Sequence, residues 1–242
     1  MADFTSPKPL IRRSNRNCLH CSLRPKTPVV GAASGFLEAM NVVKQEVQWP
    51  AKQLLHAKQL PANQVLVIQQ GFVGISGAGS EEEGRMLGVA GPGQVLFVEQ
   101  LMPGFPAFGS MRTLTRLYGC LLPVQLLHAA DGLRRESLCF FEQSTLFYQQ
   151  SLLRMQQLAQ ANVLQRMVLS IDHVLQAGGF SAKGELLLPL RRSDWASLAQ
   201  ITTESAIRAM AKLEARGFIE KKGRMLRLLP AFQPIYLLDD LK

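Results

Sequence analysis

The sequence predicts an α+β protein in three successive parts: a β-rich barrel or jelly roll, a long helix, and a C-terminal part with two short helices and a β-hairpin. Short apolar runs separated by Gly and Pro fill residues 51–130, which is typical of an antiparallel β-rich domain. Residues 138–176 contain neither Pro nor Gly, and good helix formers dominate there. Residues 192–228 combine helix caps, apolar periodicity and a basic turn, which predicts the C-terminal part.

The composition favours a polyanionic partner. The 242 residues include 27 Lys or Arg and 18 Asp or Glu, giving a net charge of +9, and ten of the cations fall between Lys183 and Arg227. A basic surface of this kind suits nucleic acid. No apolar run approaches the ~18 residues of a membrane span, and the first residues lack the apolar core of a signal peptide. We therefore expect a cytoplasmic protein without membrane contact, in which the four cysteines are free thiols, metal ligands or redox sensors.

The N-terminal half divides into an arm and a β-rich domain. Residues 1–30 are basic, rich in Pro and without periodicity, which predicts a partly extended arm containing Cys18 and Cys21. This arm is too poor in apolar residues to dock strongly by itself. A short helix is expected near residues 36–43. Residues 31–137 then form the predicted β-roll domain, with strands expected at Val65–Ile68, Phe72–Ile75 and Val95–Val98.

One long helix is predicted over residues 138–177, ending at Gly178-Gly179. Apolar residues recur in it at sevenfold spacing and at the partner positions of a coiled-coil seam: Leu146, Leu153, Leu164, Met167, Ile171 and Val174. Two interpretations remain open on periodicity alone. The seam pairs two protomers, or the helix is buried within one.

The segment after residue 178 predicts a helix-turn-helix followed by a hairpin wing. Ser193-Asp194 can cap the first helix, and Thr202 can cap the second, from Thr203 to Arg216. The second helix directs Ala206, Met210 and Leu213 inward. Gly217 ends it, and the basic turn Lys221-Lys222-Gly223-Arg224 joins two short strands. The alternative interpretation is a charged helix and hairpin that form a solvated surface only.

Residues 192–208, RSDWASLAQITTESAIR, resemble the helix-turn-helix of the CRP/FNR transcription regulators. Asp194 and Glu204 keep the family's ten-residue separation, whereas Gln200 stands where the family usually has Gly, so the turn is expected to be strained or reshaped. The resemblance implies a cyclic-nucleotide-binding-like β-roll at 31–137, a dimerisation helix at 138–177 and a winged helix-turn-helix DNA-binding domain at 178–242. It also implies a homodimer that binds double-stranded promoter DNA and works with RNA polymerase.

The resemblance also assigns DNA contacts. Glu204 and Arg208 would face base edges, since carboxylates accept from cytosine and guanidinium groups donate to guanine, and Arg192 and Ser205 would hold phosphate. The wing cations suit phosphate contacts that fix the register. The predicted DNA-binding residues are Arg192, Thr203, Glu204, Ser205, Arg208, Lys212, Lys222 and Arg224.

The cysteines resemble those of the oxygen-sensing FNR branch. Cys18-Leu19-His20-Cys21 matches its N-terminal cysteine segment, and Tyr118-Gly119-Cys120 matches the place of its distant cysteine. Thr27 stands nearest the place of a third N-terminal cysteine. An iron–sulfur cluster wants about four thiolates, so Cys139, His20 or a non-protein ligand would have to complete one. A thiol–disulfide switch without iron and a purely structural role for small apolar side chains remain alternatives.

Other signals and classes are also weighed. The segment after Gly93 lacks the family's Gly-Glu-Leu, Arg112 is the only plausible phosphate partner, and Glu99 and Arg112 are interpreted as surface or loop charges, so cAMP binding is not expected. The same fold could instead sense a haem-bound gas, with His56 or His128 as the haem ligand, or another small ligand. A cupin-like metal enzyme needs several converging His, but the four His show no paired spacing and no catalytic constellation emerges. The sequence therefore predicts a regulator without catalytic residues.

Overall fold

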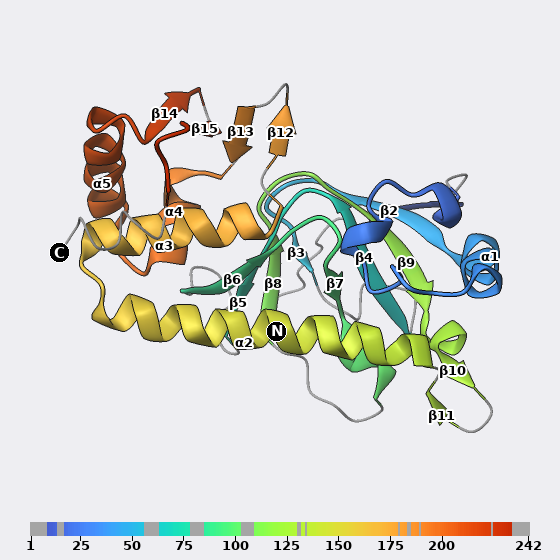
Figure 1. The fold of residues 1–242 in the computed structure, drawn as a ribbon. Coiled ribbons are helices and arrows are strands. Elements are labelled where there is room, and N and C mark those ends of the chain that lie inside the picture. Colours follow the sequence, from blue (N-terminus) through green and yellow to red (C-terminus); the bar gives the residue numbers. More distant parts are fainter. Residues whose placement is uncertain are drawn as a thin grey trace, which may run out of the picture. The chain divides into compact units, whose positions relative to one another are not determined.

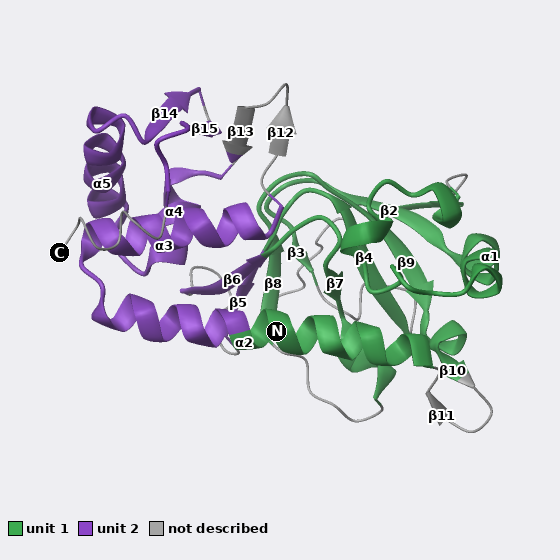
Figure 2. Cartoon of the chain, in the orientation of Figure 1, with its two compact units in different colours: residues 1–73, 90–149 green, residues 74–89, 150–242 purple. Residues whose placement is uncertain are grey.

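The computed structural model describes residues 9–13, 17–55, 63–77, 85–102, 109–129, 132–133, 135–178, 180–182, 185–188, 190–223 and 225–233. It divides into two compact units, each assembled from two stretches of chain (Figure 2). Unit 1 comprises residues 1–73 and 90–149, and unit 2 comprises residues 74–89 and 150–242. The chain thus passes between the units three times. Among the described residues, no helix is both long and apolar enough to cross a membrane.

The N-terminal arm is part of the packed structure of unit 1. Strand β1 (Leu10–Arg13) pairs antiparallel with β2 (Gln45–Trp49). Two 3-10 turns, η1 (Cys18–His20) and η2 (Arg24–Lys26), and helix α1 (Ser34–Val43) lie between them in the sequence. Val29 is buried in the core, and Leu19 packs against it. The partly extended arm agrees with strand β1, but the expectation that it docks only weakly by itself is wrong, because a few apolar side chains and one strand pairing hold it.

The main sheet of unit 1 has the strand order β1-β2-β9-β4-β7. Its other strands are β4 (Gln64–Gln70), β7 (Val95–Leu96) and β9 (Leu117–Pro123). Four consecutive residues of β4, Val65–Ile68, are buried, as in a strand covered on both faces. Gly71 follows β4 with φ 99°, where a Cβ would collide with the Arg116 carbonyl oxygen. Only glycine fits that turn.

Shorter elements complete unit 1. Strands β3 (Leu54–Leu55) and β8 (Ser110–Thr113) pair antiparallel, as do β10 (His128–Ala129) and β11 (Gly132–Leu133). Two further 3-10 turns are η4 (Val98–Leu101) and η5 (Val124–Leu127). Glu99 in η4 is only 5% exposed, so its prediction as a surface charge is wrong. Val98 and Leu101 on either side of it belong to the core and bring its carboxyl inside.

The helix predicted over 138–177 is interrupted. Helix α2 spans Arg135–Gln160 and α3 spans Val163–Gln176 (Figure 1). Asn162 caps α3: its side-chain oxygen accepts from the Leu164 and Gln165 amides, each at 3.0 Å, and the Gln165 side chain accepts from the Asn162 amide at 3.0 Å. This reciprocal capping box starts a new helix.

The interruption separates the predicted seam into two parts. Leu146 and Leu153 on α2 are 48% and 52% exposed, whereas Met167, Ile171 and Val174 on α3 are fully buried. The second half of the seam therefore serves the core of unit 2, and the prediction that it pairs two protomers is wrong for α3.

Unit 2 combines these helices with a second sheet. Strands β12 (Phe180–Ala182), β13 (Glu185–Leu188), β14 (Ile219–Lys222) and β15 (Met225–Leu228) form a sheet of order β12-β13-β15-β14. Helices α4 (Arg192–Ala199) and α5 (Thr203–Ala215) lie between β13 and β14 in the sequence. Strands β5 (Val73–Ser76) and β6 (Met86–Ala90) are neighbours in another sheet. Residues 86–89 of β6 belong to unit 2, although the sequence assigns them to the β-roll.

Candidate nucleic-acid interface and cysteine pocket

Helix α4 is fixed at its start by a side chain from within its first turn. The Asp194 carboxylate accepts a hydrogen bond from the Arg191 amide at 3.1 Å, which satisfies a donor that the helix leaves free. The helix therefore begins at Arg192 with Arg191 at the N-cap, not at Ser193-Asp194 as predicted. Trp195 and Leu198 on the inner face of α4 are buried, so this face anchors the helix to unit 2.

The turn between α4 and α5 has a left-handed residue. Gln200 ends α4 with φ 55° and ψ 43°, a conformation that costs a non-glycine residue about 1 kcal/mol. Strain at Gln200 agrees with the sequence prediction. Thr202 then caps α5 as predicted, since its hydroxyl oxygen accepts from the Ser205 amide at 3.2 Å.

Helix α5 has one buried and one exposed face. Ala206, Met210 and Leu213 are buried, as the periodicity predicts, and Ala209 is buried as well. Thr203, Glu204, Arg208 and Lys212 are exposed, whereas Ser205 is half-buried and its hydroxyl accepts from that of Thr202 at 3.0 Å. The exposed face offers donors, an acceptor and two cations, which is the chemistry that reads base edges in a major groove.

Two cations of the hairpin after α5 are paired with carboxylates. The Lys221 ammonium lies 2.6 Å from the Glu214 carboxylate, and this hydrogen bond lowers the pKa of Glu214. Arg227 pairs with Glu220 at 2.7 Å. Lys222 is exposed at the end of β14, and Arg224 lies outside the described residues. Of the predicted wing contacts, the structure thus places Lys222 on the surface.

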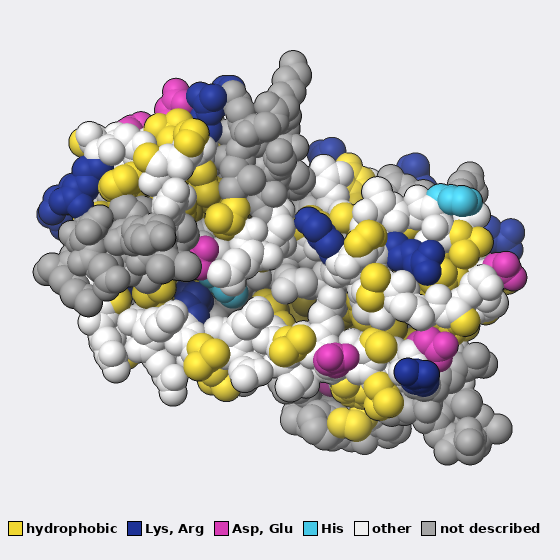
Figure 3. Space-filling view, in the orientation of Figure 1, with side chains coloured by type: hydrophobic (Ala, Val, Ile, Leu, Met, Phe, Trp, Pro, Cys, Tyr) yellow, Lys and Arg dark blue, Asp and Glu magenta, His cyan; other side chains and the backbone are white. Residues whose placement is uncertain are grey.

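Basic side chains gather on this part of the surface. In Figure 3, Lys and Arg side chains lie over α5 and β14. Arg192 is exposed at the start of α4. Strands β12 and β13 were not predicted, although the run Leu186-Leu187-Leu188 followed by Pro189 is a signal for a short buried strand.

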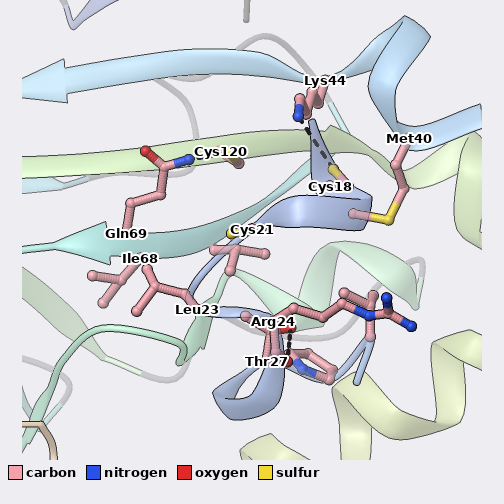
Figure 4. Close-up of a pocket in the computed structure, with 13 residues that line it drawn as sticks. Cys18, Cys21, Leu23, Arg24, Thr27, Met40, Lys44, Ile68, Gln69 and Cys120 are labelled. Carbon is pink, nitrogen blue, oxygen red and sulfur yellow. Dashed lines mark hydrogen bonds between the residues drawn. The ribbon is translucent and has the colours of Figure 1, made fainter. Parts of the chain in front are cut away.

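Three cysteines line one pocket of unit 1 (Figure 4). Cys18 and Cys21 come from η1 and its C-terminal end, and Cys120 comes from β9. The pocket has about 480 Å³ of empty space, its opening to solvent included, and its wall also contains Thr27, Lys44 and other side chains. The structure therefore brings together the three thiols that the sequence singled out, while Cys139 on α2 is not in the wall.

The three thiols have different surroundings. The Lys44 ammonium donates to the Cys18 sulfur at 3.2 Å, and the Gln69 amide donates to the Cys120 sulfur at 2.7 Å. Burial raises the pKa of Cys120 to about 12, although Lys44 acts in the opposite direction. In the reduced protein at neutral pH, Cys120 is therefore a neutral thiol.

The donor set does not fit an iron–sulfur cluster held by four protein ligands. Thr27 is buried, and its hydroxyl donates to the Arg24 carbonyl at 2.9 Å, so this side chain is used in closing η2. His20 is exposed. The described residues contain no group of three or more Cys, His, Asp or Glu arranged to hold a metal ion. The candidate haem ligand His56 lies outside the described residues, and His128 is half-buried in β10, away from the pocket wall.

Comparisons with known proteins agree with this architecture. Residues 152–230 match the family model of the Crp-like helix-turn-helix domain. No curated protein sequence matches the chain.

Several solved structures match most of the chain. FixK2 from Bradyrhizobium japonicum is 18% identical with a TM-score of 0.67, covering 81% of this chain and 97% of its own. The CRP/FNR family regulator TTHA1359 from Thermus thermophilus is 16% identical with a TM-score of 0.61, covering 80% and 98%. A CooA variant from Carboxydothermus hydrogenoformans is 14% identical with a TM-score of 0.59, covering 95% and 97%.

The exposed face of α5, the capped turn before it and the hairpin after it are the parts of a winged helix-turn-helix. Residues 152–230 therefore form a Crp-like helix-turn-helix DNA-binding domain, and the chain has the fold of the CRP/FNR transcription regulators.

Proposed function

We propose that this chain is a sequence-specific transcription regulator whose affinity for promoter DNA depends on the redox state of Cys18, Cys21 and Cys120. The observation that carries the proposal is the single pocket that these three thiols share. The exposed donors and cations of α5 supply the DNA-reading surface. The resemblance of the cysteine spacing to the FNR branch supports oxygen or redox state as the signal.

The pocket supports a thiol form of this chemistry. One molecule of hydrogen peroxide oxidises two thiols to one disulfide, with release of two waters, so atoms and electrons balance. A disulfide between an arm cysteine and Cys120 would replace the hydrogen bonds from Lys44 and Gln69 to the reduced sulfurs. The arm would then shift relative to β9, which is the change of state that a switch requires.

A homodimer is part of the proposal. The solvent face of α2 exposes Leu138, Leu146, Leu152 and Leu153, an apolar row that suits the same row of a second copy. Two reading helices related by a two-fold axis would then address a palindromic site. RNA polymerase is the expected further partner of a promoter-bound regulator.

The test measures DNA affinity with reduced and peroxide-treated protein. A binding duplex is first selected from a random-sequence pool. Wild-type affinity should change with oxidation. Cys120→Ser should remove the change, and so should serine at the arm cysteine that forms the disulfide, tested with Cys18→Ser and Cys21→Ser. Cys139→Ser is the matched control, because Cys139 does not line the pocket, and it should keep the wild-type response.

Two results would contradict the proposal: a wild-type affinity that ignores redox state, or a response retained in all three serine variants. The ultraviolet–visible spectrum of anaerobically purified protein distinguishes the related sensors. A colourless protein supports thiol chemistry, whereas cluster or haem absorption would point to a cofactor-based signal.

A further inference from the structure

Arg154 on α2 is a buried cation that joins two segments of unit 2 far apart in the sequence. Its side chain is 5% exposed. One guanidinium nitrogen donates to the Leu198 carbonyl at 2.8 Å, and another donates to the Leu87 carbonyl at 2.7 Å and the Met86 carbonyl at 3.5 Å. Burial lowers the pKa of Arg154 to about 10, so it remains charged at neutral pH. One side chain therefore ties β6 to the end of α4.

Two more hydrogen bonds hold the same strand. The Met86 amide donates to the Ser197 hydroxyl oxygen at 3.2 Å, and the Val89 amide donates to the His173 Nε2 atom at 2.9 Å. Burial first, and the nearby Arg154 second, lower the pKa of His173 to about 3, so the imidazole is neutral and can accept. β6 is thus bound to α4 and to α3.

These bonds end at the turn that orients the reading helix. Leu198 lies two residues before Gln200, the left-handed residue between α4 and α5. Arg166 on α3 donates to the Gln200 carbonyl at 3.4 Å and to the Ala161 carbonyl at 3.0 Å. Arg154 and Arg166 therefore both bond to the end of α4, and of these two arginines Arg154 is the one whose hydrogen bonds also reach β6.

The chain that leaves β6 leads to the cysteine pocket within unit 1. Ala90 ends the strand and the turn Gly91–Gln94 follows. Ile68, which lines the pocket, exchanges two backbone hydrogen bonds with this turn: its amide donates to the Gln94 carbonyl at 2.9 Å and its carbonyl accepts from the Gly93 amide at 2.8 Å. The next residue, Gln69, donates to the Cys120 sulfur.

The same turn touches the cysteine arm. A Cβ at Gly93 would lie 2.6 Å from the Lys26 carbonyl oxygen, so the arm packs directly on this glycine. The Gln143 side chain donates to the Lys26 and Gly93 carbonyls, each at 3.2 Å. Lys26 ends η2, whose first residue, Arg24, is in the pocket wall. A change in the arm therefore acts on the turn that continues β6.

We infer that β6 is the relay between the cysteine pocket and the helix-turn-helix, and that Arg154 is the positioning residue that connects the strand to α4. This inference deepens the proposed function, since it takes the cysteine pocket as the sensor. A chemical change at the arm cysteines shifts the turn Gly91–Gln94. The strand then transmits the shift through its hydrogen bonds with Arg154, Ser197 and His173 to the start of the reading helix.

The test perturbs the pocket without a redox reaction. In a Cys139→Ser background, the arm cysteines of the full chain are capped with iodoacetamide under reducing conditions, and the DNA dissociation constant is measured before and after capping. Capping should change the wild-type constant by about 5- to 150-fold, the usual range of allosteric coupling. Arg154→Met should bring that ratio close to one, because methionine fills the space without donors.

Two variants make the test specific. Arg166→Met is the matched control. It removes a guanidinium that bonds to the same turn but leaves the hydrogen bonds between Arg154, β6 and α4 in place, so it should keep the wild-type ratio. Gly93→Ala disturbs the other end of the relay, because the added Cβ would clash with Lys26 at a residue with φ 94°. Its ratio of dissociation constants before and after capping should fall close to one, as for Arg154→Met.

Amide hydrogen exchange gives a readout that does not need DNA. Capping should change the exchange rates of the Met86 and Val89 amides in the wild type but not in Gly93→Ala. A capping ratio of one in the wild type, or a wild-type ratio kept by Arg154→Met, would overturn the relay. A strong capping effect in a protein that ignores peroxide would instead refute redox sensing and leave the relay standing.

Discussion

The ammonium group of Lys44 lies 3.2 Å from the Cys18 sulfur, although Lys44 is only 4% exposed. The same ammonium donates to the Asn41 side-chain oxygen at 3.1 Å, and that oxygen accepts from the Cys18 amide at 2.8 Å. Asn41 thus holds together Lys44 and Cys18, which both line the pocket. Cys120 in the same pocket contacts the uncharged amide of Gln69. The Cys18 sulfur therefore accepts from a charged donor, whereas the Cys120 sulfur accepts from a neutral one.

The different surroundings of these sulfurs predict the order in which the thiols react. The nucleophile is the thiolate, and burial raises the pKa of Cys120 to about 12, so little thiolate forms there at neutral pH. In native protein, iodoacetamide should label Cys120 more slowly than Cys18 and Cys21, and the Cys120 rate should rise steadily as the pH increases. Peptide mass spectrometry gives the three rates. In urea they should converge, and equal rates in the native protein would contradict the assigned surroundings.

The exposed face of α2 predicts the oligomeric state. Leu146 and Leu153 lie one heptad apart and are both about half exposed, so charges placed there should oppose a paired copy. The double variant Leu146→Lys, Leu153→Lys should be monomeric at micromolar concentration, where the wild type should be a dimer by light scattering. Val42→Lys on α1, at a valine 85% exposed, is the matched control and should not change the mass. A monomeric wild type, with or without DNA, would refute the dimer.

The helix-turn-helix was predictable because its signals are local. Thr202 caps α5, and the spacing of Ala206, Met210 and Leu213 already defines the inner face. The α3 stripe misled the prediction because Met167, Ile171 and Val174 satisfy two patterns at once, a coiled-coil seam and a buried amphipathic face. Burial in unit 2 decides between them, and periodicity within one helix does not contain that information.

The relay shows why other features were beyond sequence reasoning. Met86 and Ser197 form a hydrogen bond across 111 positions of sequence, and no local pattern connects them. The cysteine pocket was found because its residues are chemically distinctive, whereas Lys44 and Gln69, which distinguish its sulfurs, are ordinary polar residues in the sequence.

Glu99 predicts a pH-dependent stability. Its side chain is buried, and one carboxyl oxygen has no hydrogen-bond partner among the described residues. Burial raises the pKa of Glu99 above its ordinary value of 4.5, so the folded state holds this proton more tightly than the unfolded state. The protonated Glu99 therefore contributes its full stabilisation of the folded state below pH 4.5. This contribution is lost as the pH rises through the folded-state pKa of Glu99.

The isosteric variant Glu99→Gln removes this titration. At pH 7 it should unfold at higher urea than the wild type, with a gain of about 1 to 3 kcal/mol, the usual cost of an unsatisfied buried polar group. The gain should shrink toward pH 4.5. The exposed carboxylate of Glu38 on α1 provides the control, since Glu38→Gln should change little. A gain for Glu99→Gln that is the same at both pH values would contradict the raised pKa.

The last prediction distinguishes a residue that reads base sequence from one that contacts the phosphate backbone. Arg208 is exposed on α5, and Lys222 is exposed at the end of β14. A guanidinium in the major groove pairs with particular bases, whereas a wing lysine meets the phosphate backbone of any duplex. Arg208→Ala should cost about 1 to 3 kcal/mol on the selected site and relax discrimination at one base pair, with little effect on random DNA. Lys222→Ala should weaken every duplex alike and reduce the salt slope by about one. Binding titrations on selected and random duplexes at several salt concentrations give both quantities. If both variants lose the same affinity on both DNAs, α5 is not the reading helix.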